Sequence, residues 1–304
     1  MSIPLKNDKK IIKSKKYHLF NEEQYNILSN KLLNEKLGSF EYQYELSLEL
    51  SYIIYDMYEK NIYNFSYNTN NELIGIININ LNTNGLFVNI SARFEGINEK
   101  NETVLIINIS KNFKNLNKDI FIKQITNAVS HELMHSNIIQ QKLKNNINID
   151  DILDIPEYYN YIIYMMGQSD EDSILYWYSR ALYVTYYQEV NAIVSQTHVQ
   201  IFNQLGYGKQ NTNDDIRKAL VKTEPYITYS TILNDIIPTL KKMTDEEIYN
   251  NISKHYETML GINDISVDFI KKSLNKIENI SKKALHNICR NAMIEGKSIS
   301  KIIL

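Results

Sequence analysis

The segment of about 118–144 constrains the fold of this chain more than any other stretch. It contains neither proline nor glycine, and apolar residues recur in it at spacings of three and four, which predicts one long helix with a stripe facing the interior. Asn117 can cap this helix, and Asp119 adds negative charge to its first turn. The residues of the stripe are Phe121, Ile125, Ala128, Glu132, His135 and Ile139. A carboxylate and an imidazole therefore lie on a face that we expect to be buried.

The stretch His131-Glu132-Leu133-Met134-His135 has the pattern His-Glu-x-x-His. On a helix the two imidazoles point to one side, about 6 Å apart along the axis, and can share one cation. The carboxylate of Glu132 then lies beside the open position of the metal, where it can take a proton from water. Burying such groups costs free energy unless a partner compensates, and a metal ion is such a partner. We therefore expect His131 and His135 to be metal ligands and Glu132 to be the general base of a hydrolase.

Strand patterns precede this helix. The runs are 72–81, 86–91 and 103–109, with a turn at Asn84-Gly85 between the first two. Together they predict a small twisted sheet over about residues 70–110, with the motif helix laid across one face.

Strands followed by a helix that carries this motif resemble the zincin superfamily of metallopeptidases. The resemblance covers about residues 70–200 and implies an α+β fold, with a small twisted sheet packed on the motif helix. It also implies one zinc ion per chain, with three protein ligands and one water. Metzincins have glycine three residues after the motif and His or Asp three further, where this chain has Ile138 and Gln141. The resemblance is therefore to gluzincins, whose third ligand is a glutamate from a later helix.

Glu189, in Glu189-Val190-Asn191-Ala192, fits that gluzincin pattern. It lies in a run of about 172–204 with helical apolar periodicity, and Ala192 would let this helix approach the motif helix closely. Glu157 is the second candidate, because thermolysin-like enzymes have their ligand at a shorter distance along the chain. His198 is the third candidate, although it lies nine residues beyond Glu189 and half a turn out of phase with it.

The resemblance also implies roles. Zinc held by His131, His135 and Glu189 lowers the pKa of its water, and Glu132 takes up the proton and passes it to the departing amine. Zincins often use a Tyr, His or Arg to stabilise the oxyanion. Tyr186, one turn before Glu189, is the best placed. Further candidates are Tyr183, Tyr187, Arg180 and His198.

A ligating histidine usually donates its other ring N–H to a carboxylate, a carbonyl or water. Candidate acceptors are Asp170, Glu171, Asp172 and Asn191. The three acids fit equally well as first-turn acids of the helix that follows Ser169, and this is the interpretation that we favour.

Composition limits the class of protein. The formal net charge of −2 argues against general nucleic-acid binding. Cys289 is the only cysteine, so an intramolecular disulfide is impossible, which suits a reducing compartment. Neither a spanning helix nor a signal peptide is recognisable, so we expect no membrane partner and a location in the cytoplasm or within a phage particle. The abundance of Asn, Ile, Lys and Tyr indicates an AT-rich genome, such as that of a bacteriophage or a low-GC bacterium.

The same patterns predict three parts of the chain. Residues 1–20 are a basic flexible tail. Residues 21–212 form the zincin-like domain, which begins with two helices, the second starting near Ser39. Residues 213–304 form a helical subdomain packed on that domain.

Two functions from different classes are compatible with this sequence. One is a zinc endopeptidase that acts on a protein or peptide substrate. The other is a catalytically inactive zincin-like structural or binding protein, for example a phage virion or regulatory component. Glu132 beside both histidines favours the enzyme, because structural zinc sites are usually closed by four ligands and have no use for a base.

Overall fold

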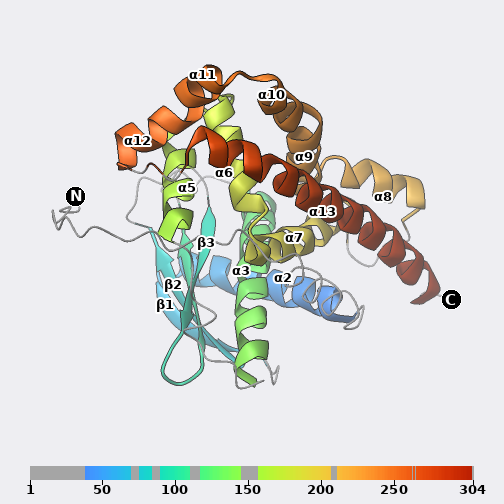
Figure 1. Ribbon diagram of the computed structural model, residues 1–304. Coiled ribbons are helices and arrows are strands. Elements are labelled where there is room, and N and C mark those ends of the chain that lie inside the picture. The colour runs from blue at the N-terminus through green and yellow to red at the C-terminus, as the bar shows by residue number, and fades with distance from the viewer. Residues whose placement is uncertain are drawn as a thin grey trace. The chain divides into compact units, whose positions relative to one another are not determined.

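The computed structural model describes residues 38–69, 75–83, 90–109, 117–144, 157–206, 211–261, 263 and 265–302. Within these ranges the chain is an α+β protein, mostly helical, with a four-stranded mixed sheet (Figure 1). The first elements are α2 (Gly38–Glu59), β1 (Asn64–Asn68), β2 (Ile76–Asn82), β3 (Ser91–Ile97), β4 (Thr103–Asn108) and α3 (Lys118–Lys144). The next are α5 (Glu157–Gln168), α6 (Ile174–Val184) and α7 (Tyr187–Leu205). The remainder are α8 (Asn213–Leu220), α9 (Glu224–Thr231), η2 (Ile232–Ile236), α10 (Ile237–Lys242), α11 (Asp245–Ile248), η3 (Tyr249–Ser253), α12 (Lys254–Leu260) and α13 (Val267–Ile302), of which η2 and η3 are π-helical.

The strands pair in the order β1-β2-β4-β3. β2 and β4 run parallel at the centre, while β1 and β3 are antiparallel to their neighbours. The buried side chains of the central strands are Ile77, Ile79, Leu81, Thr103, Leu105 and Ile107. On the other face polar side chains bond across the strands, as Asn82 does with Asn108 at 3.1 Å. β2 therefore directs its buried isoleucines to the core and its asparagines to the other face, where β4 places Val104 and Ile106.

The sequence predicts a turn at Asn84-Gly85 between strands over 72–81 and 86–91, whereas the described strand that follows β2 in the chain is β3, which does not pair with β2. β4 lies between β2 and β3, and β3 begins only at Ser91. Residues 84–89, which include the expected turn, lie outside the described residues. The two central strands each bury one apolar face, whereas Arg93 and Glu95 are exposed and suit β3 to the edge of the sheet.

α2 and α3 cover the apolar face of the sheet and form the main core with it. α2 begins at Gly38, close to the start predicted near Ser39, and α3 lies across the sheet as predicted. At their contact, Ser51 Oγ lies 2.9 Å from Thr126 Oγ1, because small side chains let the two helices approach closely. The other helix predicted over residues 21–63 and the basic tail at residues 1–20 lie outside the described residues.

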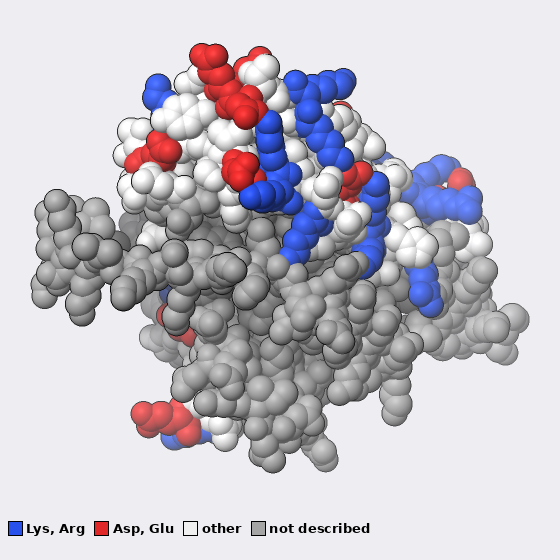
Figure 2. Space-filling model, in the orientation of Figure 1, with Lys and Arg blue, Asp and Glu red and all other residues white. Residues whose placement is uncertain are grey.

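From residue 213 onward the described residues are almost entirely helical, as the sequence pattern predicts. Two buried hydrogen bonds connect these helices to α6, one between the hydroxyls of Tyr178 and Ser273 (3.0 Å) and one between those of Ser179 and Tyr256 (2.7 Å). Figure 2 shows basic and acidic side chains interspersed on one face of this region. Many of them form ion pairs, which contribute little to stability at an exposed surface.

None of the helices in the described ranges combines the length and the apolar character that crossing a membrane requires.

The contact of α3 with the sheet can be tested by two isoleucines of that helix. Ile125 is fully buried, whereas Ile120 is 45% exposed. We expect Ile125→Ala to lower the free energy of unfolding by about 2 to 5 kcal/mol, because it removes core contacts and leaves a cavity. The matched change Ile120→Ala should alter it by less than about 0.5 kcal/mol. Urea unfolding followed by circular dichroism measures both, and equal effects would contradict this assignment of the core.

Candidate metal centre

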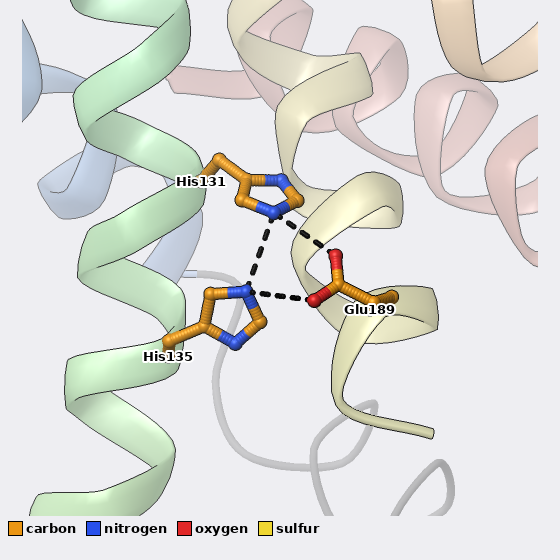
Figure 3. A group of neighbouring side chains, drawn as sticks. All are labelled: His131, His135 and Glu189. Carbon is orange, nitrogen blue, oxygen red and sulfur yellow. Dashed lines mark hydrogen bonds and ion pairs between the residues drawn. The ribbon is translucent and has the colours of Figure 1, made fainter. Parts of the chain in front are cut away.

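α3 presents the His-Glu-x-x-His motif from a well-defined helix. The side chain of Asn117 accepts a hydrogen bond from the backbone N–H of Asp119 at 2.9 Å, which satisfies a free donor at the start of the helix. The observed range Lys118–Lys144 agrees with the predicted helix of about 118–144. Because His131 and His135 are one turn apart, both imidazoles leave the helix on the side that faces α7 (Figure 3).

Glu189 lies in the first turn of α7, because the helix predicted over about 172–204 is divided into two. α6 ends at Val184, where the hydroxyl of Thr185 donates to the carbonyls of Ala181 (2.7 Å) and Leu182 (3.2 Å). The backbone of the next residue, Tyr186, is extended, and α7 begins after it. The expectation of one continuous helix is therefore wrong, because local hydrogen bonds compete with helix continuation. The break places the carboxylate of Glu189 at the positive end of a helix dipole.

The small side chain of Ala192 lets α3 and α7 pack closely beside the motif. Ala192 is fully buried and packs with Met134 and Ile138 of α3, which confirms the close approach predicted from this alanine. Further along, the side-chain amide of Asn203 donates to that of Asn127 at 2.8 Å. These contacts set the distance between the two helices that carry the histidines and the glutamate.

The structure brings His131, His135 and Glu189 together, with their candidate ligand atoms within 4.8 Å of one another (Figure 3). Nε2 of His131 lies 3.2 Å from Nε2 of His135 and 3.2 Å from Oε2 of Glu189. Nε2 of His135 lies 3.5 Å from Oε1 of Glu189. Ligands of a tetrahedral zinc ion, with bonds of about 2.0 to 2.2 Å, are separated by about 3.3 to 3.5 Å. The three residues therefore fit one zinc-sized ion in both donor type and spacing.

The three side chains are poorly exposed, at 14% for His131, 13% for His135 and 7% for Glu189. Burial lowers the pKa of His135 to about 4. Burial also acts to lower the pKa of His131, but the hydrogen bond and charge of Glu189 outweigh it and raise that pKa. Burial opposes the charge of Glu189, yet its bonds to the imidazoles lower its pKa to about 2. The carboxylate is thus ionised, as a metal ligand must be.

Glu132 has a different environment from Glu189. Its Oε2 accepts a hydrogen bond of 2.7 Å from the backbone N–H of Phe94 in the edge strand β3. Burial raises the pKa of Glu132 to about 7, although His131 and this hydrogen bond act in the opposite direction. A carboxyl group with a pKa near neutrality suits a group that must both accept and release a proton.

Tyr159 is a residue of this site that sequence reasoning missed. It lies in α5 and is 7% exposed, and its hydroxyl donates to Oε1 of Glu189 at 2.5 Å. Its ring stacks on that of Tyr183, which also hydrogen-bonds to Glu189. Burial raises the pKa of Tyr159 far above its usual range, so the hydroxyl remains a donor. In a chain with 23 tyrosines, no sequence signal distinguishes this one, since α5 is separated from both ligand helices along the chain.

The candidate oxyanion donors Tyr186 and Arg180 have different surroundings in the structure. Tyr186 is the residue that precedes α7, and its buried ring packs against Tyr159 with centroids 4.8 Å apart. Arg180 forms an ion pair with Glu224 at 2.5 Å and lies 5.6 Å from the ring centroid of Tyr183. The side chain of Tyr187 lies outside the described residues.

The alternative third ligands do not join the group of three in the described residues. His198 is buried further along α7 and is not a member of that group. Glu157 is the first residue of α5, and its side chain lies outside the described residues.

The acids considered as partners of the histidines are exposed. Asp170, Glu171 and Asp172 precede Ser173, whose side chain caps α6, and the first turn of α6 contains no acid. The favoured interpretation of these acids as first-turn residues is therefore wrong, because the cap lies after them. Asn191 is half-buried and lies in α7, two residues beyond Glu189.

Comparisons of the chain with protein-family models, curated proteins and solved structures find no match. Its function is therefore inferred from the geometry of this site.

Replacing either Glu132 or Glu189 by glutamine removes one carboxylate from the site. The opposite pKa shifts of these two residues predict opposite effects on the stability of the metal-free protein. The raised pKa of Glu132 contributes stability below about pH 4.5, which is lost as the pH rises through about 7. The lowered pKa of Glu189 contributes stability above about pH 4.5, which is lost as the pH falls through about 2. At pH 8 we therefore expect Glu132→Gln to stabilise the protein and Glu189→Gln to destabilise it, each by about 1 to 3 kcal/mol.

Urea unfolding in the presence of a chelator, at pH 5 and pH 8, measures these effects. The advantage of Glu132→Gln should grow with pH, and Glu99→Gln, at an exposed turn, should have little effect. Destabilisation by Glu132→Gln at pH 8 would contradict the assigned environments.

Proposed function

We propose that this protein is a zinc-dependent metallopeptidase of the zincin type. The observation that carries the proposal is the convergence of His131, His135 and Glu189, whose ligand atoms have the spacing of a tetrahedral zinc site. Glu132, on the same helix, supplies a carboxylate beside them.

A metal ion accounts for this cluster better than hydrogen bonding does. Two imidazole nitrogens face each other at 3.2 Å, and at most one proton can lie between them. A cation shared by both nitrogens and the carboxylate satisfies all three groups at once. Two nitrogen ligands and one oxygen ligand occur in catalytic zinc sites, and the His-Glu-x-x-His helix favours zinc over the other divalent ions that imidazole also binds. When bound, the ion would supply Lewis acidity that makes water nucleophilic and polarises a carbonyl group.

Two features support catalysis over a structural role for the metal. In the described part of the chain, the group of possible ligands has three members, whereas structural zinc sites are usually closed by four. Glu132 is also held in place, since the N–H of Phe94 binds its Oε2 and leaves Oε1 to take up a proton from water. Glu132 can then release that proton to a departing amine.

A peptide substrate is supported by the edge of the sheet. β3 pairs only with β4 among the described strands, and the N–H of Phe94 points to its other side, toward Glu132. An extended peptide can add to such an edge through backbone hydrogen bonds. We therefore propose protein or peptide substrates, in the cytoplasm or within a phage particle, without nucleic-acid or membrane partners.

We expect the purified protein to retain about one zinc ion per chain, and Glu189→Ala to lose most of it, because a three-ligand site cannot spare its carboxylate. The matched change Glu157→Ala, at the start of α5, should leave the zinc content unchanged. Metal analysis by mass spectrometry after dialysis measures both variants. The reverse result would overturn the choice of the third ligand.

Glu132→Gln should retain zinc while losing cleavage of a broad peptide library by at least about 100-fold, because the amide cannot accept the proton from water. Glu99→Gln, on the exposed turn before β4, should keep both properties. Liquid chromatography of the digests measures cleavage. Zinc in the native protein without any cleavage would favour the second function, a catalytically inactive zincin-like structural or binding protein.

A further inference from the structure

The two oxygens of Glu189 have different partners, and this difference indicates how the carboxylate is aimed. Oε2 lies 3.2 Å from Nε2 of His131. Oε1 accepts the hydroxyl of Tyr159 at 2.5 Å and lies 3.5 Å from Nε2 of His135. Among these contacts the shortest is the one with Tyr159. This residue belongs to α5, whereas both imidazoles belong to α3.

The hydroxyl of Tyr159 is held in a fixed place. Its ring lies between two others, stacked on Tyr183 with centroids 5.4 Å apart and tilted against Tyr186 at 4.8 Å. It is 7% exposed, so few other rotamers are accessible to it. A rigid donor of this kind restricts the rotation of the carboxylate that it binds.

A hydrogen bond from a neutral hydroxyl to an ionised carboxylate is short and strong. Without it, the carboxylate of Glu189 would lose its shortest contact and would be less restricted about its last torsion, which has a broad energy profile. The ordering of the carboxylate would then have to be achieved when the metal binds, and the cost would lower the affinity.

Resting on the proposed function, we infer that Tyr159 is a positioning residue for the metal, which fixes Oε1 of Glu189 and so presents the carboxylate to the ion that His131 and His135 share. Tyr159 acts through Glu189 and does not itself bind the ion. Its hydroxyl hydrogen is committed to Oε1, so it is also not the donor to a substrate oxyanion.

The experiment compares Tyr159→Phe with Tyr178→Phe. Both remove one hydroxyl from a buried tyrosine and keep the ring, but the hydroxyl of Tyr178 bonds to Ser273, away from the three ligands. Zinc affinity is measured by competition with a chromogenic chelator. Cobalt is then added as a probe, and its visible absorption reports the geometry of the site.

We expect Tyr159→Phe to bind zinc about 10- to 100-fold more weakly and to alter the cobalt spectrum, as loss of a partner of a metal ligand does. Tyr178→Phe should bind as the native protein does, even if its unfolding temperature falls. Tyr186→Phe should also keep the native affinity, since it leaves the bond from Tyr159 to Glu189 in place.

Each other outcome has a defined meaning. Native affinity and an unchanged cobalt spectrum in Tyr159→Phe would overturn the inference but not the proposed metal site. Equal weakening by Tyr186→Phe would also overturn it, because the effect would then not be specific to the bond from Tyr159 to Glu189. Failure of the native protein to bind zinc or cobalt would overturn the proposed function itself. Should Tyr159→Phe not fold, Tyr159→Met, a flexible side chain without a donor, carries the same expectation.

Discussion

The buried negative charge of Glu189 is the constraint on which the rest of this site depends. A buried carboxylate of this kind would destabilise the fold without compensation. Its partners are His131 and His135 from α3, Tyr159 from α5 and Tyr183 from α6. Helices α3, α5, α6 and α7 must therefore pack around one charge, and the small side chain of Ala192 lets α3 and α7 approach closely. A cation in the centre would complete the compensation.

The two carboxylates of the site, Glu189 and Glu132, have different environments. Glu189 accepts bonds from charged or strongly polar groups, which lower its pKa to about 2 after outweighing its burial. Glu132 has one backbone donor, and burial raises its pKa to about 7. Groups whose environments push their pKa values apart are typical of catalytic sites. The pair thus combines a permanent anion, suited to a metal, with a group suited to proton transfer.

Sequence patterns predicted the position of a residue where that position depends only on the helix to which the residue belongs. The uninterrupted apolar stripe predicts α3 within its observed bounds, and the spacing of His131 and His135 predicts their common side. The sequence of β3 does not identify it as a strand in the same way. Its exposed positions hold Arg93 and Glu95, and few of its residues face the core. A strand at the edge of a sheet is defined by its neighbour β4 more than by its own composition. The break before α7 could not be predicted, because the apolar periodicity of the run continues across it and neither proline nor glycine marks an end.

The amino-acid sequence by itself determined the motif helix, the pair of imidazoles and the candidate carboxylates, because helical periodicity is a local property of the chain. Only the tertiary structure decided that Glu189 meets both histidines, that Phe94 holds Glu132 and that Tyr159 binds Glu189. These contacts join residues between 30 and 58 positions apart, and their formation depends on the packing of whole helices and strands. The amino-acid sequence thus specifies which chemical groups are present, whereas the tertiary structure sets the distances between them.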